Sequence, residues 1–408
     1  MAPNIFPKEG CVENDNDTSD KSNKILNISG SMTNGRLNDT ELSKNVIEDT
    51  YKTSSEYKMH IRWFNVFIFL YLHISAIYGL YLLYTDAKWS TYAFTHVLMT
   101  FSGFGVTAGA HRLWAHKAYK ARLPLRILLM IAHTTAHQNS LYAWVRDHRI
   151  HHKFTDTDAD PYNAKRGFFF SHIGWLMVHK HHLVIEKGNV IDMDDMKQDP
   201  VVMFQKKYFI PLMILFCFFL PTFIPMYFFN ESFIVAFHTA TLFRYVWMLN
   251  STWSVNSAAH IWGMKPFNKI SSSAENGYVA FFALGEGWHN YHHAFPWDYK
   301  TGELGKYGLN WSTAFIDFFA KIGWAYDLKT VSEEVIRNRA LKTGDGSHEF
   351  CKQEKKLDNC KQNMDYNHNI NSNNNDKSID NLIWGWDDPS ISIQDKLSAV
   401  ILKKEKNI

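Results

Sequence analysis

Histidine is the residue type that stands out in this chain of 408 residues, which contains 21 of them. Most of the histidines that could bind a metal lie in three short motifs, here called boxes. His111 to His116 has the spacing HxxxxH, whereas 148–152 and 289–293 both have HxxHH, and a further His260 lies between the last two. Neutral imidazole is a common protein ligand of iron, zinc, copper and nickel. The boxes therefore predict a metal site.

The number of these histidines indicates two metal ions, because nine imidazoles exceed what one ion can use. The candidate ligands are His111, His116, His148, His151, His152, His260, His289, His292 and His293. In an α-helix, positions i, i+3 and i+4 share one face, so each HxxHH box presents three imidazoles in an arc that can address two neighbouring ions. HxxxxH instead separates its imidazoles by about 140° on an α-helix, so either the helix ends between them or they approach the site from different sides.

A single histidine more often makes a structural hydrogen bond than binds a metal. We interpret His73, His96 and His238 in that way, since they lie inside apolar stretches. Three boxes of defined spacing are a stronger signal than any lone residue.

Composition excludes some classes of protein. The chain is 46% hydrophobic with a net charge of only +3, which disfavours a nucleic-acid binder because no broad basic field is present. The four cysteines are too few and too scattered for a disulfide framework.

The elements that must position the histidines are long apolar stretches. A helix needs about 20 apolar residues to cross a bilayer, and we predict such spans at 63–84, 92–110, 208–229 and 233–255. Short loops join the first pair and the second pair. The predicted fold class is an all-α integral membrane protein, with four transmembrane helices in two hairpins and a helical cap that holds the His-rich site.

Basic residues predict the orientation of these spans. Fifteen Lys and Arg lie in 111–207, whereas the loops 85–91 and 230–232 contain only Lys88. The positive-inside rule places the cap and both termini in the cytosol. Residues 1–58 and 343–408 are polar, the latter rich in Asn and Lys, and we expect both to be disordered tails around a membrane domain at 59–342.

The boxes and their flanks resemble a known family. The segments 111–116, 146–154 and 285–293, together with Asp160-Pro161 and 256–260, closely resemble membrane-bound acyl-CoA desaturases of the stearoyl-CoA, or delta-9, type. The likeness covers roughly residues 57–346. It implies a four-span protein of the endoplasmic reticulum membrane with a cytosolic di-iron site.

The resemblance also implies a division of the ligands between two irons. His111, His116, His148, His152 and His292 would hold one iron, and His151, His260, His289 and His293 the other, with Asn256 contacting the second through water. Dioxygen bound at the reduced pair would remove two hydrogens from adjacent methylenes of an acyl chain of about C16–C18.

Further positions match residues of that family that bind substrate. Those matching the head-group contacts are Asn65, Asn139, Arg146, Asp147, His179, Lys180 and Trp253. His179 and Phe64 stand where the family commonly has Arg. Met99 and Gly103 resemble positions at the closed end of the acyl tunnel, where Gly103 is expected to leave room.

The resemblance implies a separate electron donor, because we find no haem-binding HPGG motif in either tail. The expected partners are cytochrome b5 and its NADH-dependent reductase. Three alternatives share some of the features. They are a desaturase of other regiospecificity, such as the delta-11 type, a di-iron lipid hydroxylase, and a membrane metal transporter, whose ligands would lie near the bilayer midplane.

Overall fold

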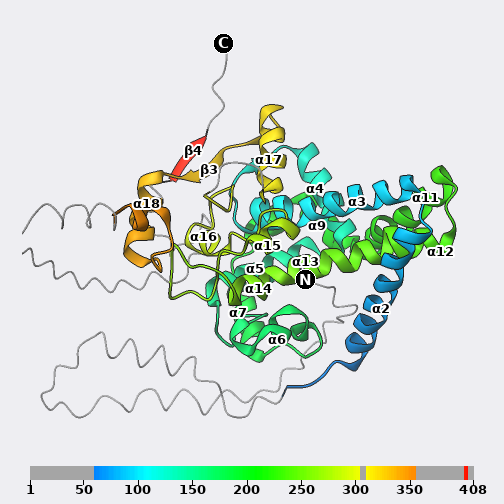
Figure 1. The fold of residues 1–408 in the computed structure, drawn as a ribbon, viewed down its shortest axis with the longest axis horizontal. Helices are drawn as coiled ribbons and strands as arrows, with labels where there is room; N and C mark the ends of the chain where they lie inside the picture. Colours follow the sequence, from blue (N-terminus) through cyan, green and yellow to red (C-terminus); the bar gives the residue numbers. More distant parts are fainter. Residues whose placement is uncertain (1–58, 304–308, 355–398, 403–408) are drawn as a thin grey trace, which may run out of the picture. The chain divides into compact units, whose positions relative to one another are not determined.

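The computed structural model describes residues 59–303, 309–354 and 399–402, and these residues fold mostly into helices (Figure 1). The predicted tail at 1–58 lies outside the described residues. The apolar part contains α2 (Trp63–Thr85), α3 (Trp89–Phe104), η1 (Gly105–Ala115), α10 (Phe209–Met213), η4 (Ile214–Phe219), α11 (Leu220–Phe229), α12 (Phe233–Ala236), η5 (Phe237–Phe243) and α13 (Arg244–Asn256).

Two helices of the described residues are long and apolar enough to cross a membrane, 63–85 and 209–229. Both expose many large apolar side chains, among them Phe67, Ile77 and Phe228. The other two expected spans lie within unbroken helical runs at 89–115 and 233–256. These two runs are long enough to cross a membrane, but they contain more polar residues and are therefore less apolar than the first two helices.

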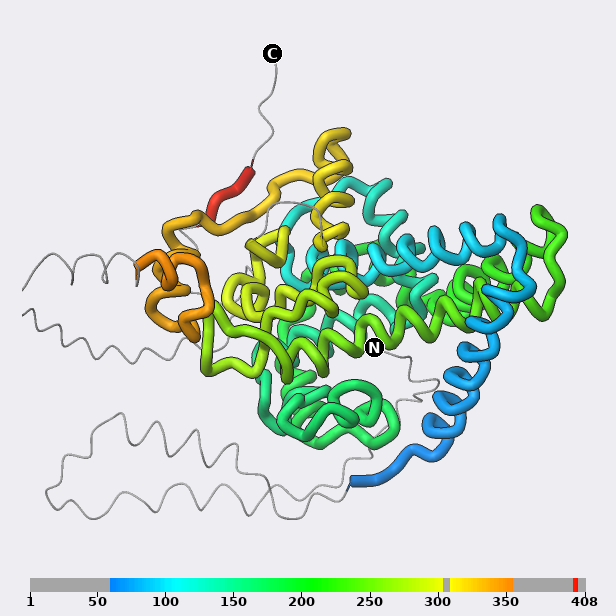
Figure 2. The backbone as a smooth tube through the Cα atoms, viewed as in Figure 1, coloured from blue at the N-terminus to red at the C-terminus, as the bar shows by residue number. Residues whose placement is uncertain are grey.

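The helices are paired as two hairpins with their turns at one end of the bundle (Figure 2). Lys88, in the turn between α2 and α3, donates from Nζ to the carbonyl oxygens of Phe229 and Asn230, in the turn between α11 and α12. Gly79 lets α2 approach η5 closely, since a Cβ there would overlap the backbone of His238. Small residues allow such close helix contacts in membranes.

The remaining helices surround the far ends of η1 and α13. The longer ones are α4 (Leu123–Ala136), α5 (Leu141–Phe154), α7 (His182–Val190), α9 (Pro200–Lys207), α17 (Trp311–Lys321) and α18 (Glu333–Thr343). The shorter ones are η2 (Ala164–Arg166), α6 (Phe168–His172), η3 (Gly174–Leu176), α8 (Asp194–Gln198), α14 (Ala258–Ile261), α15 (Gly277–Phe282) and α16 (His289–Ala294).

Two small antiparallel sheets, which the sequence did not predict, tie distant segments together. β1 (Lys120–Ala121) pairs with β2 (Ala325–Tyr326), and β3 (Leu328–Val331) pairs with β4 (Ala399–Leu402). β4 and residues 343–354 belong to the range expected to be a disordered tail, yet Leu328 pairs with Leu402 and the Cys351 side chain is buried. The rest of that range, 355–398 and 403–408, lies outside the described residues.

Candidate metal centre

The first box lies on a π-helix, which explains its spacing. His111 is part of η1, and His116 follows its last residue, with the His116 N–H donating to the His111 carbonyl. This i→i+5 hydrogen bond places residues five apart one above the other. The two rings are 4.8 Å apart between centroids. The sequence analysis left open whether the helix ends between the two residues or whether they approach from different sides. The helix ends at Ala115, before His116, and its π-helical form, which was not predicted, brings the two rings together.

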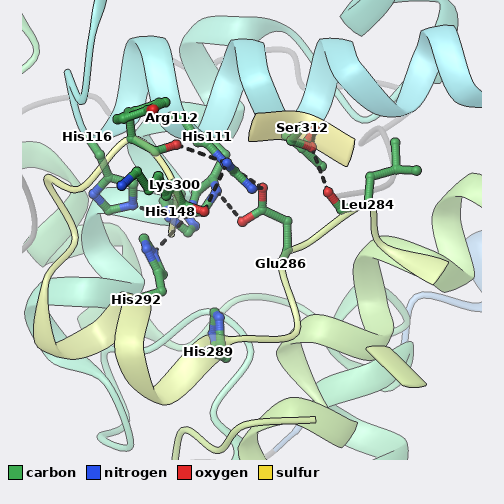
Figure 3. A network of polar contacts seen from close by, with 12 residues as sticks. His111, Arg112, His116, His148, Leu284, Glu286, His289, His292, Lys300 and Ser312 are labelled. Carbon is green, nitrogen blue, oxygen red and sulfur yellow. Dashed lines mark hydrogen bonds and ion pairs between the residues drawn. The ribbon is translucent and has the colours of Figure 1, made fainter. Parts of the chain in front are cut away.

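The other two boxes are helical, as their spacing predicts. His148, His151 and His152 lie on α5, whose first turn is capped by the Ser140 hydroxyl. His289, His292 and His293 make up half of the short helix α16, and His260 lies on α14. Figure 3 shows imidazoles from η1, α5 and α16 turned toward one another.

The nine histidines form two groups, in each of which the ring nitrogens lie within 4.8 Å of one another. One group is His111, His116, His148, His152 and His292, and the other is His151, His260, His289 and His293. This is the division that the family resemblance implies. Each HxxHH box contributes to both groups, because adjacent positions on a helix point in different directions.

The spacing of the nitrogens fits bound metal ions. Pairs of Nε2 atoms from different elements are 2.8 Å apart in His116 and His148, 3.0 Å in His111 and His292, and 2.9 Å in His260 and His289. Two imidazoles bound at right angles about 2.1 Å from one ion have nitrogens about 3.0 Å apart. His151 Nε2 is buried without a hydrogen-bond partner, as expected for an atom reserved for a metal.

Burial prepares these histidines to be ligands. It lowers the pKa of His148, His152, His260, His289, His292 and His293 well below the ordinary value, and the neighbouring imidazoles lower it further. The rings are therefore neutral at physiological pH and offer a free nitrogen lone pair.

Two buried carboxylates that the sequence prediction did not assign hold ligand rings from behind. Asp160 lies 3.0 Å from His151 Nδ1, and Glu286 Oε2 lies 2.8 Å from His111 Nδ1. The Ser272 hydroxyl is 2.7 Å from His260 Nδ1. Such contacts fix the ring orientation of metal-binding histidines. Both acids lie in the quoted motifs, but nothing in a sequence shows which carboxylate faces which ring.

Glu286 also contacts Arg112, which is fully buried and donates from Nε to Glu286 Oε1 at 2.9 Å (Figure 3). Burial alone would raise the pKa of Glu286, but Arg112 and His111 lower it to about 2. The Glu286 carboxylate is therefore charged and neutralised by Arg112. Asp160 instead accepts from the backbone N–H groups of Asp156 and Tyr162.

An apolar cavity borders both histidine groups. Its lining includes Val106 and Thr107 of η1, Trp144 of α5, Met248 and Val255 of α13, and Leu284, together with His111, His148, His151, His289 and the half-buried Asn256. A cavity of this kind can hold an aliphatic chain against the metal site.

Three of the expected head-group residues form one cluster. Lys180 donates to Asp147 at 2.6 Å, and Arg146 contacts the same carboxylate at 3.3 Å. Burial would raise the pKa of Asp147, but Lys180 and Arg146 lower it. The half-exposed cations leave donors available to an anionic ligand.

The other expected head-group residues are placed separately. Asn65 is buried and donates to the Leu176 carbonyl, whereas His179 is exposed beside His60. Asn139 accepts from the Ser140 N–H at the start of α5. Trp253 is fully buried against Phe69 and His73.

The two expected tunnel-end residues are not among those that line the cavity. Met99 packs with Leu83, Phe243 and Met248. A Cβ on Gly103 would lie 2.5 Å from Leu284 Cδ1 and 3.2 Å from Met248 Cε. The room beside Gly103 is therefore filled by other side chains of this chain.

The histidines interpreted as structural do make local hydrogen bonds. His73, His96 and His238 each contact the backbone carbonyl four residues earlier, at 2.7 to 2.9 Å. None of the three belongs to either metal group.

Comparison with known proteins agrees with this site. Residues 87–311 match the fatty acid desaturase family. The chain belongs to that family. It is a membrane-bound desaturase and hence an oxidoreductase, and the match includes all nine histidines of the two groups.

Several desaturases of different regiospecificity are similar to this chain. An acyl-CoA Delta-9 desaturase of Acheta domesticus is 52% identical, over 87% of this chain and 89% of its own length. An acyl-CoA Delta(11) desaturase of Trichoplusia ni is 51% identical, over 84% of this chain and 89% of its own. An acyl-CoA Delta12-desaturase of Acheta domesticus is 53% identical, over 73% of this chain and 84% of its own length.

Proposed function

We propose that this desaturase inserts a cis double bond, at the delta-9 position, into saturated acyl-CoA substrates of about C16–C18. The observation that supports it is the apolar cavity directly beside two groups of buried histidines. The delta-9 assignment rests on the family default and on the broad coverage of the Delta-9 relative. The Delta(11) and Delta12 relatives are about as identical to this chain as the Delta-9 relative, so the position of the double bond is tested by the experiment below.

The metal in this proposal is iron, two ions per chain, held by the nine histidines, with Asn256 contacting the second through water. When bound and reduced, the irons would supply the O2 chemistry that removes hydrogen from unactivated methylenes. The chain positions the substrate carbons. The cavity walls would hold the acyl chain against His111, His148 and His151 and limit the access of water to the reacting carbons.

The polar end of the substrate would be bound at the cluster of Arg146, Asp147 and Lys180. Charge-assisted hydrogen bonds from Arg and Lys suit the phosphates of CoA. Asn65, Asn139, His179 and Trp253 complete the proposed head-group contacts. Electrons would come from cytochrome b5 and its NADH-dependent reductase.

We also propose four membrane spans in the endoplasmic reticulum, with both termini cytosolic. The runs 89–115 and 233–256 supply the second and fourth spans beside the two apolar helices. A glycosylation acceptor inserted near Lys88 is expected to be modified and one inserted near Lys187 is not. The reverse result would contradict this orientation.

Expression in a desaturase-deficient host tests the activity. We expect monounsaturated products whose double bonds map to carbon 9. We also expect His151→Ala to reduce product formation at least 100-fold, because it removes a metal-binding imidazole that Asp160 holds in place. His182→Ala is the control, since His182 is exposed and outside both groups. Products heavier by one oxygen would indicate a hydroxylase, and a double bond at carbon 11 or 12 would replace the delta-9 assignment.

A further inference from the structure

Leu284 lies at an unusual bend between α15 and α16. Its φ is +56°, in the left-handed region that a leucine adopts at a cost of about 1 kcal/mol. Gly285 follows with a φ of +115°, and a Cβ there would overlap the Asn310 side chain. A backbone that departs from its preferred conformation persists only when its surroundings hold it, and such positions cluster at functional sites.

The surroundings of this bend are the start of α17 and one turn of η1. The Leu284 carbonyl accepts from both the N–H and the hydroxyl of Ser312, at 3.1 and 2.9 Å. The Ser312 hydroxyl lies 2.6 Å from Thr107 Oγ1 on η1. The Leu284 backbone is therefore fixed relative to the helix that positions His111.

The side chain of Leu284 lies between the cavity and Gly103. It lines the cavity with Val106, Thr107 and Met248, and its Cδ1 occupies the space where a Cβ of residue 103 would project. In the view of Figure 3, Leu284 lies on the opposite side of Glu286 from His116 and His148. Gly103, which its Cδ1 abuts, lies eight residues before His111 on the unbroken helical run 89–115, about two helical turns away, so Leu284 meets the cavity at a distance from that ligand.

We propose that Leu284 is the stop against which the methyl end of the acyl chain rests, and that Gly103 serves to admit the Leu284 side chain rather than the substrate. This inference rests on the proposed function. A fixed stop sets how many carbons fit beyond the metal groups, so it determines both the preferred chain length and the carbons that face the metals.

Variants of opposite size test this stop in the purified full chain. Leu284→Ala should favour longer substrates and Leu284→Phe shorter ones, because a methylene in a hydrophobic pocket is worth roughly tenfold in discrimination or more. We expect the ratio of C20 to C16 turnover to rise about tenfold in Leu284→Ala. Leu284→Met, which conserves the volume, is the control and should keep the wild-type profile.

A second pair of variants tests the contact with Gly103. Gly103→Ala should change the chain-length preference, because the new Cβ meets Leu284 Cδ1. The double variant Gly103→Ala/Leu284→Ala should restore the use of long chains, because it lacks the Leu284 side-chain atoms that this Cβ would meet. Equal profiles for Gly103→Ala and the double variant would overturn the pairing.

Two readouts separate this inference from the proposed function. Double-bond positions report turnover, while thermal stabilisation by saturated acyl-CoAs from C14 to C20 reports binding without turnover. A wild-type chain that binds these ligands but makes no unsaturated product would refute the proposed function alone. Unchanged chain-length dependence of the stabilisation in both Leu284→Ala and Leu284→Phe would overturn the stop.

Discussion

The two carboxylates behind the metal groups differ in how their charge is balanced. Glu286 faces His111 and is neutralised by Arg112. Asp160 faces His151, and among the described residues its other hydrogen bonds come from the backbone N–H groups of Asp156 and Tyr162. A carboxylate without a neighbouring cation makes its histidine the more electron-rich ligand. The four-histidine group therefore depends more on its carboxylate than the five-histidine group does.

We expect Asp160→Asn to lower the metal affinity of the four-histidine group by about 10- to 100-fold, because the ring of His151 loses its anionic acceptor. Metal content per purified chain, measured by mass spectrometry during titration with a chelator, should fall from two ions to one before the wild type loses any.

Glu286→Gln should have the smaller effect, since the five-histidine group has an additional ligand. Asp327→Asn is the matched control, because Asp327 pairs with the exposed Lys120 away from the site. Simultaneous loss of both ions in Asp160→Asn would contradict the assignment of Asp160 to one group.

At the scale of elements, the π-helix η1 is what brings the first box to the other two. It packs along α4, and at Gly105 the two backbones lie so near each other that a Cβ would overlap the backbone of Ala132 and His133. Backbone atoms cannot move aside as a side chain can, so this contact fixes the distance between the two helices.

Gly105→Ala is therefore expected to cost at least about 1–3 kcal/mol of stability and to lower the Tm of the purified protein by several degrees. Gly277→Ala, in the first turn of α15, is the control, because no heavy atom lies within 4 Å of a Cβ there. Thermal unfolding followed by intrinsic fluorescence checks both variants. Equal Tm values for the two would show that α4 adapts and does not hold η1.

The sequence predicted the helical boxes and the apolar runs because both depend on local periodicity. It failed where the outcome depends on contacts between distant residues. The π-helical form of the run that carries His111 was not predicted, since nothing local distinguishes a π-helix. Gly103 was expected to leave a void, but Leu284, distant in the chain, fills it. β4 reaches β3 from a segment whose composition resembles a tail.

At the scale of the whole molecule, the site joins four segments that are far apart in the chain, and Glu275 links two of them. Its backbone bridges to Met264 and Trp288, and its Oε1 accepts from the Tyr291 N–H of α16 at 2.7 Å. Glu275 thus connects the segment after His260 with the third box. Burial raises the pKa of this carboxyl from 4.5 to about 8.

The raised pKa of Glu275 gives stability a defined dependence on pH. Between about pH 4.5 and 8 the folded chain keeps a proton that the unfolded chain releases, so this group destabilises the fold as pH rises, by up to about 1.4 kcal/mol per pH unit. The buried histidines act in the opposite direction, and in the unfolded chain they still release protons for about one pH unit above their pKa of about 6.5. The contribution of Glu275 is therefore read from the difference between the wild type and a variant that lacks this carboxyl.

Glu275→Gln should remove this dependence, because the amide oxygen still accepts from Tyr291 but no proton is released. We expect the Tm of the wild type to fall relative to that of the variant as pH rises from 6.5 to 8. Glu303→Gln is the control, since Glu303 lies near Glu275 but has a partly exposed carboxylate paired with His348. Parallel Tm curves for the wild type and Glu275→Gln would mean that the carboxyl is already charged in the folded protein, and that its link to α16 is an ionic one.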